Sequence, residues 1–322
     1  MAVSIEFYSD WMKEQIIVLF CNQYQEDKNE FSLFFDQFYD NDFQKEKAIK
    51  IVAVDGEKVV GFQSFFYWPY QKGTDVFNSF QSGNSLVHPD YRGQGLFKRM
   101  LEFTYSNQAK IGIDFMVGFP VEASFNSFVR NKWVNLFNLQ WYVKVVNYIA
   151  PIASVFVNSE TKLKKEFELS PKYEESLEGS QNIRLAESLS FKEWRNSYRK
   201  DQLYYASFEL GSNFVEFEFK YNVRKKIVGE IVIGNINTNS QDDSFFKESL
   251  TKVIKRLQKL NFVTLVSVAI NEECLTIFNK EIKNSFKRID KSIYFIIKGI
   301  GNDNFLDKSE NWSVMRSDID TW

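Results

Sequence analysis

The apolar residues of the first half are spaced as in two helices followed by a mixed series of strands and helices. Near the N-terminus they recur at helical spacing, and further on they cluster in short β-branched and aromatic stretches. Asp55-Gly56 separates the first two of these stretches and favours a tight hairpin turn. The expected elements are helices near 11–20 and 31–38, strands at 48–54, 59–68 and 76–87, a helix at 96–110, a strand at 113–119, a helix at 124–131 and a strand at 139–146.

Charged residues crowd together around Pro171 and Gly179, and we place a domain boundary there. The predicted division is a first domain over 1–157, a charged linker over 158–181 and a second domain over 182–322. A charged surface helix inside a single domain would explain the same composition.

The second half repeats the order of elements of the first half. It lacks a glycine loop before its long helix, so we interpret it as a second copy of the same fold that has lost its site. The expected class is α/β with a mixed sheet. The expected elements are strands at 204–209, 214–221 and 227–233, a helix at 245–260, a strand at 262–270, a helix at 272–283 and a strand at 292–298.

Composition excludes several classes of function. The 322 residues carry 40 basic and 42 acidic side chains, and this net charge of −2 argues against a nucleic-acid partner. Two cysteines, Cys21 and Cys274, are too few for a disulfide framework. The single histidine, His88, excludes a site with two histidine ligands, so no metal is expected.

The sequence also bears on location. Glu6 and Asp10 interrupt the N-terminus before an apolar run can build, so no signal peptide is expected. The most apolar stretch, 142–157, is shorter than the ~20 residues of a spanning helix and contains Lys144 and Pro151. We therefore expect a cytoplasmic protein without a membrane span.

The segment 85–101 gives the most specific indication of a binding site in the sequence. It reads as a strand, a turn fixed by Pro89, and a helix opened by Gly93 and Gly95. The first turn of a helix exposes unpaired N–H groups and partial positive charge, and glycine lets a phosphate approach them. Taken alone, an ordinary strand–helix turn would explain the pattern equally well.

The whole string resembles motif A of the GNAT acyltransferase superfamily, a loop that cradles the pyrophosphate of coenzyme A. Arg92, Gly95 and the preceding Val87-His88-Pro89-Asp90-Tyr91 fit that motif, whereas Phe97 stands where glycine or alanine is usual. The resemblance implies a GNAT fold for the first domain and a degenerate GNAT-like fold for the second.

The resemblance also implies the coenzyme site. An acyl-CoA, acetyl-CoA or another, would be the co-substrate, with pantetheine between strands 76–87 and 113–119. An N–H near 85–87 would face the thioester oxygen, and the acceptor amine would attack directly without a covalent enzyme intermediate. The residues expected to bind the coenzyme are Leu86, Val87, Arg92, Gly93, Gln94, Gly95, Leu96, Phe97 and Lys98.

The catalytic residues of the superfamily are not matched. Phe128 occupies the position of the tyrosine that often protonates the thiolate, and 76–87 contains no carboxylate. Glu122, Tyr67 and Tyr70 are weak candidates, and each is better explained as an ordinary surface or turn residue. Water-mediated deprotonation of the amine would need no such residue, since acid–base assistance contributes only about 10²–10⁴-fold.

The C-terminal segment 311–322 places two acids between tryptophans. A frayed end is one interpretation. The other is that it folds back toward the acceptor cleft, because it resembles the ending of bacterial two-domain GNAT proteins of surface-polysaccharide pathways.

The expected function is therefore an acyl-CoA-dependent N-acyltransferase that acts in a ternary complex on a small-molecule primary amine. An amino sugar is the first acceptor class, and a peptide or polyamine amine is the next. The alternative is a non-catalytic acyl-CoA-binding or interaction protein. The oligomeric state stays open.

Overall fold

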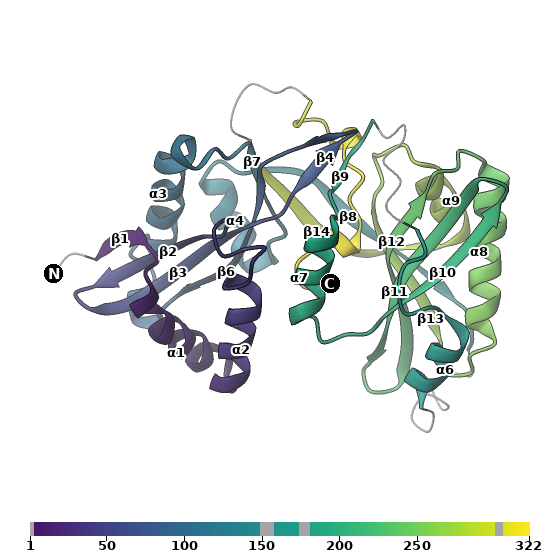
Figure 1. Ribbon diagram of the computed structural model, residues 1–322, viewed down its shortest axis with the longest axis horizontal. Coiled ribbons are helices and arrows are strands. Elements are labelled where there is room, and N and C mark those ends of the chain that lie inside the picture. The colour runs from purple at the N-terminus through teal and green to yellow at the C-terminus, as the bar shows by residue number, and fades with distance from the viewer. Residues whose placement is uncertain (1–2, 149–157, 174–180, 300–304) are drawn as a thin grey trace.

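The computed structural model describes residues 3–148, 158–173, 181–299 and 305–322. Within these residues, an 11-stranded sheet runs through the whole molecule, with helices packed against it, and a 3-stranded sheet lies beside it (Figure 1). The expected α/β class with a mixed sheet is confirmed. No helix in the described part of the chain is long and apolar enough to cross a membrane.

Each expected helix is present, but a helix at 189–198 was not predicted, and a helix at 159–166 lies in the expected charged linker, where a charged surface helix was the alternative. Asp27 begins α2 by accepting the N–H groups of Asn29 and Glu30, and Gly112 ends α3 in the left-handed conformation. The α-helices are α1 (Lys13–Tyr24), α2 (Lys28–Tyr39), α3 (Leu96–Ile111), α4 (Glu122–Arg130), α6 (Ser159–Glu166), α7 (Leu189–Tyr198), α8 (Asp243–Gln258) and α9 (Ile277–Ser285).

The strands differ from expectation in several places, and the short strands at 70–72 and 183–185 were not predicted. The expected strand 76–87 is two strands, because the N–H of Phe77 turns away to the carbonyl of Tyr70 and closes a separate hairpin. The N-terminal strand β1 was not predicted. The strands are β1 (Ser4–Phe7), β2 (Ile49–Asp55), β3 (Lys58–Tyr67), β4 (Tyr70–Lys72), β5 (Asp75–Val76), β6 (Ser79–Val87), β7 (Phe115–Gly118), β8 (Val134–Val145), β9 (Ile183–Leu185), β10 (Leu203–Leu210), β11 (Asn213–Arg224), β12 (Val228–Thr238), β13 (Leu265–Asn271) and β14 (Lys287–Gly299).

The large sheet joins the two halves of the chain through an exchange of strands. Its order is β1-β2-β3-β6-β7-β14-β8-β13-β12-β11-β10. β14, from the second half, pairs with β7, while β8, from the first half, pairs with β13. The limits of the two domains stay a prediction, and residues 149–157 and 174–180 at the expected boundary lie outside the described residues.

The C-terminal segment 305–322 is packed into the interior where the halves meet. Trp312 is fully buried, its ring centre 5.3 Å from Tyr70, 5.5 Å from Phe115 and 5.1 Å from Phe295. Its indole N–H donates to the carbonyl of Leu306 at 2.9 Å. The segment is thus part of the core rather than a frayed end.

Replacing Trp312 with alanine should lower the free energy of unfolding by about 3–5 kcal/mol, because it leaves a large cavity among packed rings. Trp11→Ala is the matched control, since Trp11 is 54% exposed and its loss should cost about 0.5 kcal/mol or less. Urea denaturation of both variants measures the difference. Equal midpoints would show that the C-terminal segment does not support the core.

Candidate functional site

β6 and β7 run parallel and then part. Their pairing covers four residue pairs and ends with Ser82 opposite Gly118. β7 stops there, whereas β6 continues to Val87 and stays paired with β3 on its other side. From Gly83 onward, this edge of β6 has no strand partner among the residues that the structure describes, and this is the separation that the resemblance implies.

A cavity of about 450 Å³ opens at this separation. Its walls are the end of β6, the turn after β7 and the first two turns of α4. Leu86 and Val87, two residues predicted to bind the coenzyme, lie in its wall, and so does Phe97. The other lining residues are Tyr24, Ser82, Gly83, Ser85, Gly118, Phe119, Pro120, Val121, Ala123, Ser124, Ser127 and Phe128.

A bulge in β6 lies beside this cavity and is held by buried hydrogen bonds. Asn84 has a positive φ of 49°, and its side-chain amide donates to the hydroxyl of Tyr39 at 2.7 Å. That hydroxyl also lies 2.6 Å from the hydroxyl of Ser64, which donates to the carbonyl of Gly83 at 2.9 Å. These bonds fix the strand in a kinked path at the point where its partner is lost.

The glycine loop forms the N-terminus of α3. Gly93 and Gly95 have φ values of 78° and 72°, a left-handed conformation that other residues adopt only at a cost. A Cβ atom at either position would meet no atom within 4 Å, so the space over the loop is open. Gly95 is the N-cap and offers no side chain to the first N–H groups of the helix.

The predicted loop residues have different environments. Arg92 donates to the carbonyl of Val87 at 3.1 Å and to the side-chain oxygen of Gln23 at 2.6 Å, which holds its charge beside the loop. Lys98 is exposed, 3.6 Å from Glu102. Leu96 is buried in the core, so only its backbone faces the loop.

Phe97 and Phe128 form one aromatic wall of the cavity. Their rings meet edge to face at 5.2 Å, and Phe128 makes the same contact with Trp133 at 5.1 Å. The indole of Trp133 donates to the hydroxyl of Tyr105 at 2.5 Å. The side chain at position 97 is thus accommodated by a second aromatic residue at position 128.

The three weak catalytic candidates are not among the residues that line this cavity, although Glu122 lies between two that do. Glu122 is exposed in the first turn of α4. Tyr67 is half-buried between Phe43 and Phe80 and lines a different cavity. Tyr70 is fully buried, and burial raises the pKa of its hydroxyl well above its ordinary value.

The structure brings a carboxylate to β6 that was not among those candidates. Asp320 accepts a hydrogen bond from the side-chain amide of Gln81 at 2.7 Å. Its other oxygen lies 3.7 Å from the position that a Cβ of Gly83 would occupy. Burial raises the pKa of Asp320, while Gln81, Arg195 and Arg316 act in the opposite direction. The acidic residues of the C-terminal segment were the only sign of this carboxylate in the sequence. Its contact could not be predicted from them, because Gln81 and Asp320 are 239 positions apart.

His88 and the two cysteines have no part in this site. The ring of His88 accepts the N–H of Asp90 at 3.3 Å and so caps the turn before the loop. Cys274 is buried, which raises the pKa of its thiol to about 12, and burial also raises that of Cys21. Among the described residues, no group of three or more His, Cys, Asp or Glu side chains could hold a metal ion.

Residues 9–127 match the family model described as the acetyltransferase (GNAT) domain. The matched segment contains the glycine loop, in agreement with the resemblance that the loop carries. No curated protein matches the chain in sequence.

Solved structures share the fold across both halves. A GCN5-related N-acetyltransferase from Anabaena variabilis has a TM-score of 0.63 at 11% identity, covering 93% of this chain and 73% of that one. A probable N-acyltransferase of unknown function from Enterococcus faecalis has a TM-score of 0.59 at 11% identity with the same coverage. N-myristoyltransferase from Saccharomyces cerevisiae, with bound myristoyl-CoA, has a TM-score of 0.52 at 13% identity, covering 100% of this chain and 86% of that one. The GNAT fold is thus confirmed, and at these identities the likeness concerns the fold alone.

Replacing Tyr39 with phenylalanine should destabilise the protein by about 1–3 kcal/mol, because the amide of Asn84 and the hydroxyl of Ser64 lose a buried partner. Tyr148→Phe is the matched control, since Tyr148 is 84% exposed. Chemical denaturation of the two variants measures the effect. If both behave like the parent protein, the bulge does not depend on this hydroxyl.

Proposed function

We propose that the protein is an acyl-CoA-dependent N-acyltransferase that moves an acetyl or other short acyl group to a primary amine. The observation that carries the proposal is the open edge of β6, which lies directly before a left-handed glycine loop at the start of α3. The matching GNAT domain model and the shared fold support it.

The loop suits the pyrophosphate of coenzyme A. The N–H groups of the first turn of α3 have no capping side chain, and the space above Gly93 and Gly95 is open. No acidic residue lies in that first turn, and Arg92 and Lys98 add positive charge beside it. Helix N-termini of this kind favour phosphate groups.

The edge of β6 suits the pantetheine arm. Backbone groups on the unpaired side of a strand can hydrogen-bond an extended ligand as they would another strand. Acyl-CoA supplies the acyl group as a thioester. An N–H near 85–87, facing the cavity, would stabilise negative charge that develops on the thioester oxygen.

Asp320 is the residue we assign as the proton acceptor. It lies against Gly83, where β6 loses its partner, and its burial-raised pKa brings it closer to that of a useful base. As the amine nitrogen bonds to the acyl carbon, the amine proton passes to the Asp320 carboxylate and the carbon–sulfur bond breaks. The sulfur leaves as a thiolate, a leaving group stable enough to depart without the tyrosine that Phe128 replaces.

The acceptor that we place first is an amino sugar, with peptide and polyamine amines next. A location in the cytoplasm, where acyl-CoA is available, belongs to the same proposal. A non-catalytic acyl-CoA-binding protein is the second candidate, and Phe128 is the observation that favours it, since its ring has no proton to give.

Calorimetric titration with acetyl-CoA should show binding in the micromolar range that Gly95→Glu abolishes, because the new carboxylate would occupy the phosphate position. Gly211→Glu is the matched control, since Gly211 also has a positive φ of 61° and open space around it but lies in the β10–β11 turn. Absence of binding by the parent protein would contradict the proposed coenzyme site.

Replacing Asp320 with asparagine should lower kcat about 10²–10⁴-fold with the amine that turns over best, and leave acetyl-CoA binding unchanged. In the parent protein, activity should fall as pH falls through the raised pKa of Asp320, and the variant should lose that dependence. Thiol release from acetyl-CoA measures both, with the exposed Asp307→Asn as control. An unchanged pH profile would exclude Asp320 as the base, and no turnover with any amine would favour the second candidate.

A further inference from the structure

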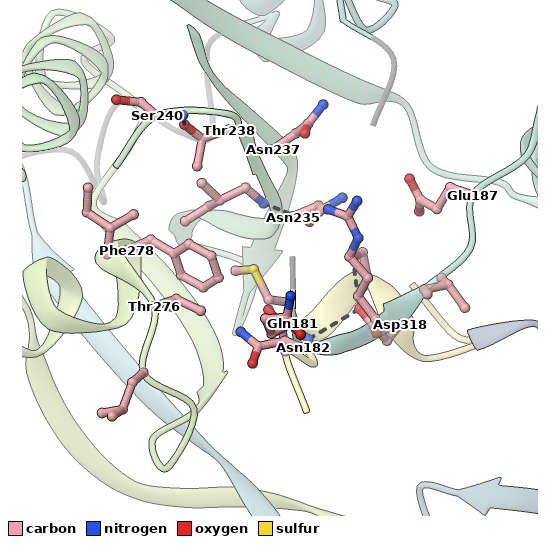
Figure 2. Close-up of a pocket in the computed structure, with 18 of the residues that line it drawn as sticks. Gln181, Asn182, Glu187, Asn235, Asn237, Thr238, Ser240, Thr276, Phe278 and Asp318 are labelled. Atoms are coloured by element: carbon pink, nitrogen blue, oxygen red, sulfur yellow. Dashed lines mark hydrogen bonds between the residues drawn. The ribbon is translucent and has the colours of Figure 1, made fainter. Parts of the chain in front are cut away.

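A second cavity, of about 320 Å³, lies in the second half of the molecule. Figure 2 shows it between the end of β12, the start of α9 and the C-terminal segment, with the ring of Phe278 facing its centre. The segment that contains Gln181 and Asn182 closes one side.

This cavity occupies the place that corresponds to the coenzyme cavity of the first half. β12 and β13 pair in parallel over four residue pairs and part after Ile233 opposite Val268, as β6 and β7 do. A register shift at Gly234 marks the bulge in β12. In the first half the cavity is lined by β6 beyond its bulge and by the start of α4. In the second half it is lined by β12 beyond its bulge and by the start of α9.

The second cavity cannot hold acyl-CoA in the same way. Asp242 caps α8 by accepting the N–H groups of Ser244 and Phe245, so the groups that would hold a pyrophosphate are already bound to a carboxylate. Asp243 adds a second negative charge in the first turn.

The chain's own C-terminal segment also fills the gap between β12 and β13. Met315 forms a bridge with Ile270 at the end of β13. The indole ring of Trp322 packs on Gly234 so closely that a Cβ there would overlap it. The space that remains is a side pocket rather than a channel for pantetheine.

The wall of this pocket offers many neutral hydrogen-bonding groups. Asn235 is oriented by accepting the N–H of Ile236 at 2.8 Å, and its amide nitrogen has no partner among the described residues. The charged Glu187 has two basic neighbours, since its carboxylate lies 3.7 Å from the ammonium of Lys192 and 4.0 Å from the guanidinium of Arg195. The neutral polar side chains of the wall include Asn182, Asn235, Asn237, Thr238, Ser240 and Gln241.

We propose that this second cavity binds a neutral saccharide unit. Side-chain amides both donate and accept, which matches the paired demands of sugar hydroxyls, and the Phe278 ring offers an apolar surface to a sugar face. A phosphorylated or carboxylated ligand fits poorly, because the wall contains two carboxylates, Glu187 and Asp318, and only one basic residue, Arg184.

The site also lies close to the proposed transfer centre. Asp318 lines the pocket, and Asp320, two residues on, contacts Gln81 on β6. Two residues span at most about 7 Å along the chain. A saccharide in contact with Asp318 would therefore lie within two residues along the chain of the residue assigned as the base, and this use of the site, unlike binding itself, rests on the proposed function.

Saturation-transfer NMR with glucose, N-acetylglucosamine and cellobiose tests the binding directly, with glucose 6-phosphate as the charged comparison. At least one neutral saccharide should receive saturation from the parent protein. The signal should be lost in Gln241→Ala and in Asn235→Ala. Gln258→Ala, an exposed glutamine on α8 outside the pocket, should keep it.

Thermal unfolding of each variant shows whether it is folded, and the exposed Gln241 makes loss of folding there unexpected. No transfer to any neutral saccharide would overturn the inference, as would a signal that survives both pocket variants or is displaced by acetyl-CoA. A failure of acetyl-CoA to bind would instead contradict the proposed function and leave this result standing.

Discussion

The pairing of β8 with β14 in the middle of the sheet is the constraint on which both halves depend. β14 pairs with β7 on the side opposite β6. All four residues of the short β7 are therefore paired with a strand on both sides. In the described part of the chain no strand continues β7 beyond Gly118, and β6 extends with β3 as its partner on the other side only. The cavity therefore results from the length of β7 and from the strand that fixes it, rather than from the glycine loop.

The C-terminal segment makes the two halves different. In the second half it covers the gap between β12 and β13 with Met315 and Trp322. In the first half it packs Trp312 on Tyr70 and Phe115 and brings the Asp320 carboxylate to Gln81 of β6. The N-termini of the two long helices differ as well. Gly95 leaves the first N–H groups of α3 free of a capping side chain, whereas Asp242 accepts hydrogen bonds from the first N–H groups of α8. The first half thus offers an open helix start beside the parting of β6 and β7, whereas the second half offers a pocket with many neutral polar groups.

Local pattern was sufficient to predict the elements that depend on nearby residues. The apolar spacing predicted helices α1, α2, α3 and α8, and the glycines of the loop predicted the open start of α3. The repeated order of strands and helices also predicted the mixed class of the fold. These features are set by backbone preference and by periodic burial, which the sequence shows directly.

Contacts between distant segments could not be predicted in this way. Nothing in the sequence of β14 indicates that it pairs with β7 rather than with a strand of its own half. The contact between Gln81 and Asp320 depends on the path of the last twenty or so residues, which tertiary packing around Trp312 determines. Tyr70 reads as a strand-end residue in the sequence, yet the same packing buries it completely.

Hydrogen–deuterium exchange with and without acetyl-CoA tests the central claim, that one of the two equivalent sites is open to the coenzyme and the other is closed. The account predicts slower exchange at 83–87 and 92–98 on adding acetyl-CoA, with no change at 235–245. Protection at the start of α8, or none at the glycine loop, would contradict it.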